Sequence, residues 1–271
     1  MVDFEYKSEY NVDDFRKIIE ILRAPGGCPW DREQTHKSIR RNLLEEAYEV
    51  CEAIDEQNPE HLREELGDVL MQVIFHARIE EEGGSFNLDD VADGACKKLI
   101  YRHPHVFGNV EVSGSEQVLR NWDELKRQEK SQTTVTKTMT DVAESLPALW
   151  RAEKIQKKAK KVGFDWADIQ GAMDKLSEEI AEFKQAQAEK DPQHIEEELG
   201  DLLFTLVNVA RFEGLDPEAA LHKSCEKFIR RFNYIEETAA KRGNELSEMT
   251  LPQMEEIYDE GKKAFNAARE E

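Results

Sequence analysis

The chain has 271 residues, and its 58 acidic and 37 basic residues give a formal net charge of −21 at pH 7. A surface this negative repels phosphate backbones, which argues against direct nucleic-acid binding. The length allows one large or two medium domains. No apolar run approaches the roughly 20 residues of a membrane helix, and the first residues lack a signal-peptide pattern. We therefore expect a cytoplasmic protein without membrane contact, whose four cysteines are reduced and mostly buried.

Low aromatic content and long Glu-, Lys-, Ala- and Leu-rich stretches predict an all-α fold. Apolar residues recur every three or four positions in residues 43–54 and 62–77, which predicts two helices with a turn at Asn58-Pro59. A second hairpin is expected around Asp191-Pro192. Further helices should follow the hairpins at about residues 88–102, 115–129, 217–240 and 251–268. One hairpin cannot bury both of its apolar faces, so these helices or a second subunit must close each bundle.

An acidic signature marks both hairpins. The pattern E-E-x-x-E at residues 45–49 is followed by E-E-L-G-D at residues 64–68, and both patterns return at residues 178–182 and 197–201. The internal spacing is the same in both copies (65 − 46 = 19 and 198 − 179 = 19). The repeat predicts two tandem domains, and a Ser/Thr-rich stretch between them is typical of a linker. We place the N-terminal domain, the linker and the C-terminal domain at residues 1–130, 131–141 and 142–271.

The signature places carboxylates on facing helices. Glu46 and Glu49 lie one turn apart on one helix, as do Glu65 and Asp68 on the next. Level residues of an antiparallel hairpin have a constant index sum, and here 46 + 68 = 114 and 49 + 65 = 114. The second copy repeats this (179 + 201 = 380 and 182 + 198 = 380) with Glu179, Glu182, Glu198 and Asp201. Converging carboxylates need a cation, and oxygen ligands favour Mg²⁺ or Mn²⁺. A solvated acidic face is the alternative, but it does not explain the duplicated geometry.

Other residues repeat with the signature. Gly67 and Gly200 stand inside helices, where glycine costs about 1 kcal/mol and indicates the close approach of another helix or a ligand. Basic and aromatic residues one turn apart follow each hairpin: Lys98 with Arg102, Lys227 with Arg231, Trp122 with Lys126, and Tyr258 with Lys262. Such pairs are suited to hold phosphates and to stack a base, while salt bridges to acidic residues and core packing are the open alternatives. His103 and His105 flank a proline without a third ligand, which favours a turn over a metal site.

The segments GCPWD, LLEEAYEV, EELGDVL, RHPHVF, GFDW and EELGDLLF resemble those of the MazG family of nucleoside triphosphate pyrophosphohydrolases in its tandem two-domain form. The resemblance covers nearly the whole chain. It implies Mg²⁺-dependent hydrolysis of nucleoside triphosphates to monophosphates and diphosphate, with Mn²⁺ as a substitute. It also implies breadth in base, a role in nucleotide-pool housekeeping or stress response, and an all-α homodimer whose bundles complete one another, with room for a regulatory protein partner.

The resemblance also assigns residues. The metal ligands of the C-terminal site are Glu179, Glu182, Glu198 and Asp201. Two further carboxylates that orient or deprotonate the attacking water are Glu178 and Glu197. The substrate contacts are Lys175, His194, Lys227, Arg231, Tyr258 and Lys262. A weaker N-terminal site consists of Glu45, Glu46, Glu49, Glu65, Asp68, Lys98, Arg102, Trp122 and Lys126.

The chain departs from the family at Tyr258, where tryptophan is frequent, and at His194, where lysine is familiar. The N-terminal equivalent of Lys175 is Asn42 (175 − 133 = 42), beside Arg41. We therefore hypothesise that the C-terminal domain carries most of the activity and that the N-terminal one is weaker or regulatory. Two other classes compete with this hypothesis. A di-iron bundle needs Glu-x-x-His pairs, which the signature lacks. A non-enzymatic acidic adaptor predicts no turnover.

Overall fold

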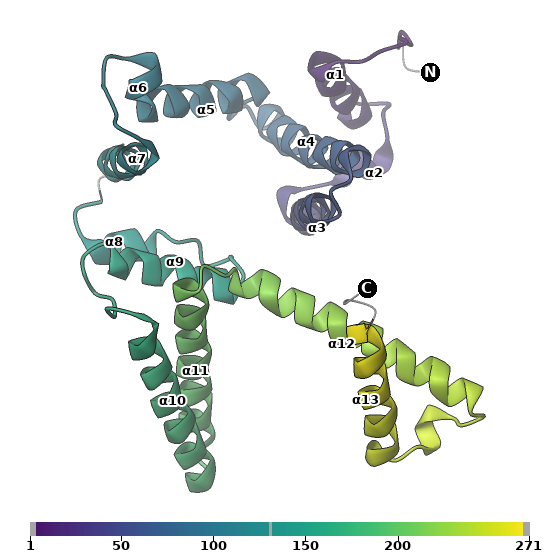
Figure 1. Ribbon diagram of the computed structural model, residues 1–271. Coiled ribbons are helices and arrows are strands. Elements are labelled where there is room, and N and C mark those ends of the chain that lie inside the picture. The colour runs from purple at the N-terminus through teal and green to yellow at the C-terminus, as the bar shows by residue number, and fades with distance from the viewer. Residues whose placement is uncertain (1–3, 130–131, 268–271) are drawn as a thin grey trace. The chain divides into compact units, whose positions relative to one another are not determined.

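The computed structural model describes residues 4–129 and 132–267, and every regular element within them is a helix. The chain divides into two compact units, Met1–Lys126 and Arg127–Glu271 (Figure 1). The predicted all-α fold is thus confirmed. None of the described helices is both long and apolar enough to cross a bilayer.

Each unit contains a hairpin of two long helices that lie side by side (Figure 1). In the first unit these are α3 (His36–Asp55) and α4 (Pro59–Glu82). In the second unit they are α10 (Ile169–Glu189) and α11 (Pro192–Phe212). Both turns fall where the proline dipeptides predicted them. The two signatures therefore lie on paired helices in both units.

The two turns share their local chemistry. The side chains of Asn58 and Asp191 cap the second helix by accepting hydrogen bonds from two backbone amides, and proline follows at the first helical position. The residue before each cap, Gln57 or Lys190, has a left-handed φ of 55° or 60°. Because both turns have the same conformation, both hairpins set their helices in the same register.

The first unit packs α1 (Val12–Arg23) against α4. Its buried core brings together one side chain from α1, one from α3 and two from α4, which are Ile19, Ile39, Ile74 and Phe75. The remaining helices of this unit are α2 (Pro29–Glu33), α5 (Leu88–Arg102), α6 (Pro104–Phe107) and α7 (Ser115–Glu129). The ends of α5 and α7 agree with the predicted helices.

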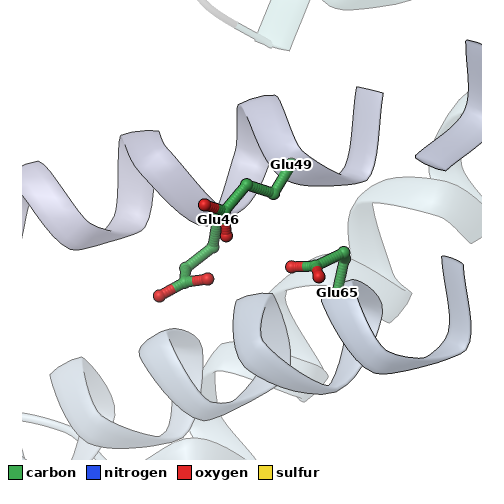
Figure 2. A group of neighbouring side chains, drawn as sticks. All are labelled: Glu46, Glu49 and Glu65. Atoms are coloured by element: carbon green, nitrogen blue, oxygen red, sulfur yellow. The ribbon is translucent and has the colours of Figure 1, made fainter. Parts of the chain in front are cut away.

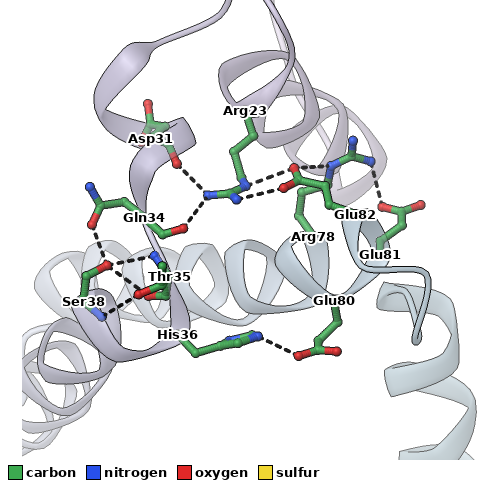
Figure 3. Close-up of polar contacts among 10 residues, drawn as sticks. All are labelled: Arg23, Asp31, Gln34, Thr35, His36, Ser38, Arg78, Glu80, Glu81 and Glu82. Atoms are coloured by element: carbon green, nitrogen blue, oxygen red, sulfur yellow. Dashed lines mark hydrogen bonds and ion pairs between the residues drawn. The ribbon is translucent and has the colours of Figure 1, made fainter.

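A buried arginine holds the segment that precedes α3, here called the lead-in loop, on this hairpin (Figure 3). The Arg23 guanidinium donates two hydrogen bonds to the Glu82 carboxylate, at 3.0 and 2.8 Å. It also donates to the backbone carbonyls of Asp31 and Gln34 in the loop that precedes α3. The loop is therefore held on the hairpin by main-chain contacts that do not depend on its own side chains.

Besides its hairpin, the second unit contains α8 (Val135–Thr140), α9 (Ala148–Lys160), α12 (Pro217–Lys241), a short 3₁₀ helix (Leu246–Glu248) and α13 (Leu251–Ala267). Helix α9 contacts both α11 and α12, and α13 packs along α12. The helices predicted at about 217–240 and 251–268 are therefore present, with residues 268–271 outside the described part of the chain.

The segment predicted as a linker, residues 131–141, is partly helical. Helix α8 lies within it and packs on α9, its Thr134 cap accepts a hydrogen bond from the Lys137 amide, and Thr138 is buried. Threonine and serine predicted a loop here because the residues that cap helices are also those that favour turns. The division between the units falls earlier, between Lys126 and Arg127, inside α7.

Part of the apolar face predicted as core is open to solvent. Val207 of α11 is 1% exposed, but Leu199, Leu203 and Leu206 of the same helix are 44–46% exposed. A Cβ atom at Gly67 or Gly200 would meet no atom within 4 Å, so the predicted close neighbour is not found among the described residues. The periodicity identified the apolar face correctly. In the single chain, however, the part of that face formed by Leu199, Leu203 and Leu206 is exposed to solvent.

The cysteines are free, as predicted, but the expectation that most are buried is wrong. Cys28 is half-buried, and the other three are exposed on helices: Cys51, Cys96 and Cys225.

Candidate active site

Three carboxylates of the first hairpin converge between its helices (Figure 2). Glu46 and Glu49 extend from α3 toward α4, and Glu65 extends from α4 toward them. One oxygen of each lies within 4.8 Å of an oxygen of the other two. Glu65 is 8% exposed, and its Oε2 atom is buried without a hydrogen-bond partner among the described residues. The site therefore contains an acceptor that no described group of the chain satisfies.

The second hairpin repeats this arrangement. Glu179 and Glu182 of α10 and Glu198 of α11 again place one oxygen each within 4.8 Å of the others. Glu179 is buried, with 4% exposure, and occupies the place that Glu46 has in the first copy (179 − 133 = 46). The fourth carboxylates of the predicted sets, Asp68 and Asp201, do not belong to these close groups.

Crowding alters the protonation of the clustered groups. Burial raises the pKa of Glu46, and the neighbouring carboxylates of Asp68 and Glu49 raise it further. Asp68 is thus near enough to act on the cluster. Burial, followed by the charge of Glu49, also raises the pKa of Glu65. In the second hairpin burial raises the pKa of Glu182, while Lys175 acts in the opposite direction. Both clusters consequently disfavour their own negative charge, and a cation would relieve that strain.

Lys175 lies on the second cluster. Its Nζ atom is 2.7 Å from Glu178 Oε1, 2.9 Å from Glu179 Oε1 and 3.9 Å from Glu182 Oε2. Hydrogen bonds to Glu178 and Glu179 raise the pKa of Lys175, which keeps the ammonium charged. The predicted substrate contact therefore neutralises the cluster in this structure.

A histidine supports the second helix of each hairpin in the same way. His61 lies 2.8 Å from Glu56 and 3.2 Å from Glu65, and His194 lies 3.1 Å from both Glu189 and Glu198. Every member of the second trio is 133 positions after its counterpart in the first. Hydrogen bonds to Glu56 and Glu189 raise the pKa values of the two histidines. Each histidine thus ties the end of one helix to a clustered glutamate on the other, an interaction that sequence reasoning missed for His61.

An aromatic ring lies between two cations after each hairpin. In the first unit the Arg102 guanidinium and the Lys126 ammonium stand 5.1 and 5.0 Å from the centroid of Trp122. In the second unit Arg231 and Lys262 stand 5.6 and 4.9 Å from the centroid of Tyr258. These distances are within the range of cation–π attraction. Three of the four basic and aromatic residues that the repeat singled out in each copy therefore form one group, and the fourth is Lys98 or Lys227.

The model of the MazG nucleotide pyrophosphohydrolase domain matches the chain twice, at residues 34–107 and 168–235. Each match contains one hairpin and its carboxylate cluster. The chain belongs to the MazG family.

Relatives of full length resemble the whole chain. A protein of Thermotoga maritima named "Nucleoside triphosphate pyrophosphohydrolase/pyrophosphatase MazG" is 45% identical over 250 residues, which are 92% of this chain and 95% of that protein. The Escherichia coli K12 "Nucleoside triphosphate pyrophosphohydrolase" is 44% identical over 255 residues, 93% of this chain and 97% of that protein. The Bacillus subtilis protein YabN is 49% identical, but the match covers 51% of its length.

The MazG-type hairpins leave several predicted residues at the surface. Glu45 is exposed and accepts a hydrogen bond from Arg41, and Glu197 is exposed at the start of α11. Lys98 and Lys227, the predicted phosphate contacts on α5 and α12, are also exposed. These side chains are therefore accessible to a ligand.

The remaining sequence predictions around the site concern His103 and Trp30. His103 forms the predicted turn between α5 and α6, and its ring lies 2.6 Å from the Leu99 carbonyl oxygen. His103 and His105 belong to neither of the carboxylate groups that could hold a metal ion among the described residues. A tryptophan precedes each hairpin in the sequence, which predicts that Trp30 and Trp166 anchor the loops there. Trp30 is 61% exposed, whereas Trp166 packs against Gly171 at the start of α10.

Proposed function

We propose that this chain is a divalent-cation-dependent nucleoside triphosphate pyrophosphohydrolase that converts a nucleoside triphosphate and water to a nucleoside monophosphate and diphosphate. The observation that carries the proposal is the pair of convergent carboxylate clusters within the two MazG-type domains. The printed names of the Thermotoga and Escherichia relatives, which match over nearly the full length, support the same reaction.

The carboxylate clusters fit a hard divalent cation. The converging atoms are all oxygens, which is the ligand chemistry of Mg²⁺ and Mn²⁺. The buried Glu65 Oε2 has no hydrogen-bond partner among the described residues, and a cation could satisfy this oxygen by coordinating it. We assign Glu46, Glu49, Glu65 and Asp68 to the first site and Glu179, Glu182, Glu198 and Asp201 to the second. A bound cation supplies charge stabilisation at the phosphates and lowers the pKa of a coordinated water.

Side chains of the protein would accept the proton, position the ligands and bind the substrate. Glu178 and Glu197 are exposed carboxylates next in sequence to the clustered ligands, and either would accept a proton from the attacking water. His194 would hold Glu198 in position from one turn earlier on the same helix. Arg231 and Lys262 would bind phosphate oxygens while the Tyr258 ring stacks on the base. In this reading Arg102, Trp122 and Lys126 are the corresponding groups of the N-terminal unit.

A second copy of the chain would complete the bundles. Leu199, Leu203 and Leu206 form an exposed apolar stripe beside Gly200, whose position is open. Such a stripe next to a small residue suits the close approach of a second helix. The leucines are 44–46% exposed, so burying what remains is worth roughly half of the 1.5–3 kcal/mol for a whole side chain, about 1 kcal/mol each. We therefore propose a homodimer that covers this stripe. A monomer at all working concentrations in sedimentation would contradict the proposal.

Product analysis tests the reaction. The protein should release nucleoside monophosphate and diphosphate from a panel of ribo- and deoxyribonucleoside triphosphates when Mg²⁺ is added, and chelation should stop the release. Nucleoside diphosphate with orthophosphate as the main products would overturn the assigned reaction. Absence of turnover with every nucleotide would favour the acidic adaptor instead.

Separate alanine substitutions test the inequality of the two sites. If the C-terminal domain carries most activity, Glu182→Ala should lose most of the turnover, whereas Glu49→Ala, its equivalent in the first copy, should lose the smaller share. The two variants remove matched carboxylates (182 − 133 = 49), so they are controls for each other. Equal losses would refute the assignment.

A further inference from the structure

The two carboxylate clusters differ in one charged contact. In the second cluster the Lys175 ammonium lies 2.9 Å from Glu179 and 3.9 Å from Glu182, two of the three converging carboxylates. These are oxygens that we assign to a divalent cation. An ammonium and a divalent cation in contact with the same oxygens repel each other strongly, so the lysine must move when the cation binds.

Within residues 4–129 and 132–267, no lysine ammonium contacts the first cluster in this way. Its equivalent of Lys175 is the neutral Asn42. The adjacent Arg41 turns away to Glu45, at 2.7 Å, and its side chain is 86% exposed. The oxygens of this cluster face one another (Figure 2), and Glu65 Oε2 remains buried without a hydrogen-bond partner among the described residues.

The histidine contacts to the clustered carboxylates are matched between the copies. His61 contacts Glu65 as His194 contacts Glu198, at 3.2 and 3.1 Å. The helices, caps and turns that carry the clusters are also equivalent. Arg41 and its counterpart Asp174 also differ in charge (41 + 133 = 174), but Arg41 pairs with Glu45 rather than with a clustered carboxylate. Among the described residues, the lysine contact is thus a charge difference at the clustered carboxylates themselves.

We propose that Lys175 and a divalent cation compete for the carboxylates of the second hairpin, so that the N-terminal site binds cations more tightly than the C-terminal site. The inference rests on the proposed function in one respect, that the clusters bind a cation. Displaced from Glu179, the ammonium of Lys175 becomes available to a phosphate group of the substrate. Cation and substrate would then favour each other's binding at the C-terminal site. The cation displaces the Lys175 ammonium from the carboxylates, and the triphosphate of the substrate then pairs with that ammonium.

Titration with Mn²⁺ in the absence of nucleotide tests the competition, with free Mn²⁺ measured by electron paramagnetic resonance. Glu182→Ala leaves the N-terminal site and Glu49→Ala leaves the C-terminal one. We expect the N-terminal site to bind Mn²⁺ about tenfold more tightly, because a unit charge a few ångströms away acts strongly even at the protein surface.

A reciprocal exchange makes the test specific. Lys175→Asn in the Glu49→Ala chain should tighten the C-terminal site by about tenfold, and Asn42→Lys in the Glu182→Ala chain should weaken the N-terminal site similarly. Lys184→Asn makes the same charge change at an exposed position of the same helix and should alter Mn²⁺ affinity less than about twofold, because separated surface charges are screened.

The outcomes separate the inference from the function on which it rests. If neither site binds Mn²⁺, the cation-dependent function fails. If both bind with equal affinity and Lys175→Asn changes nothing, the competition is wrong while the function stands. The chain with both clusters intact gives the same answer without the alanine variants: two classes of Mn²⁺ site should merge toward one in Lys175→Asn, and unmerged classes would overturn the inference.

Discussion

Removal of Asp165 should destabilise the C-terminal unit by leaving a buried cation unpaired. The Arg211 side chain is 5% exposed and holds the Asp165 carboxylate through two hydrogen bonds, one of 2.9 Å from Nη1 to Oδ2. The pair fastens the lead-in loop to α11, as Arg23 fastens its counterpart in the first unit. Breaking a buried pair by removal of one partner costs about 3–5 kcal/mol. Asn208 continues to accept from Arg211, and solvent reaches 13% of the Asp165 side chain. We therefore expect Asp165→Ala to lower the free energy of unfolding by about 3 kcal/mol, the low end of that range.

Guanidinium unfolding followed by the fluorescence of the adjacent Trp166 measures this loss. The effect should also depend on pH. The hydrogen bond from Arg211 holds the pKa of Asp165 below its ordinary value of 3.8. A lowered pKa in the folded state means that the stabilisation is present above about pH 4 and is lost as the pH falls through the folded-state pKa. The difference between wild type and Asp165→Ala should therefore shrink in acid. A loss below about 1 kcal/mol at pH 7, or a difference that grows in acid, would refute the reasoning.

Three further substitutions probe the backbone of the hairpins. Gln57→Gly should raise the free energy of unfolding by up to about 1 kcal/mol, because Gln57 has a left-handed φ of 55°, and Gln57→Ala should give no such gain in the same denaturation assay. Gly171→Ala should cost about 1–3 kcal/mol, since its Cβ would stand 2.5 Å from Cδ1 of Trp166; an unchanged melting temperature would show that the ring moves freely. Gly200→Ala should stabilise the isolated chain by about 1 kcal/mol because its Cβ meets open space, and it should weaken self-association if a second copy packs there, as sedimentation would reveal.

Rules that act within a helix or across one turn predicted the hairpins and their convergence well. The index sums depend only on antiparallel pairing about a known turn, and the structure brings the level pair Glu49 and Glu65 together with Glu46. Asp68, which the sums place level with Glu46, lies outside this close group. The proline dipeptides fixed the turn because a capping side chain followed by proline starts a helix with little influence from the rest of the chain. Local chemistry therefore determined the scaffold of the site.

Contacts beyond those rules were not predictable. Glu56 and His61 are five positions apart across a turn, so neither helical spacing nor cross-hairpin sums relate them. Arg23 and Glu82 are separated by 59 positions, and their pairing depends on how α1 packs. The position of the Lys175 ammonium follows from the choice among many rotamers of a flexible side chain, which the charge of the carboxylates decides. From the sequence we predicted that this lysine contacts a substrate phosphate, whereas its ammonium contacts the carboxylates of the cluster in the structure.

The difference between the copies at Lys175 and Asn42 bears on function more than on folding. Both positions lie within the first helix of a hairpin and are partly exposed, and neither caps the helix. Lysine and asparagine differ in helix propensity by only about half a kcal/mol, so either residue fits either fold. The features that build the hairpin, by contrast, are the same in both copies, from the capped turn to the bridging histidine. The copies share the capped turn and the bridging histidine and differ in a charge beside the cluster, so this difference would act on cation affinity if the clusters hold a cation as proposed.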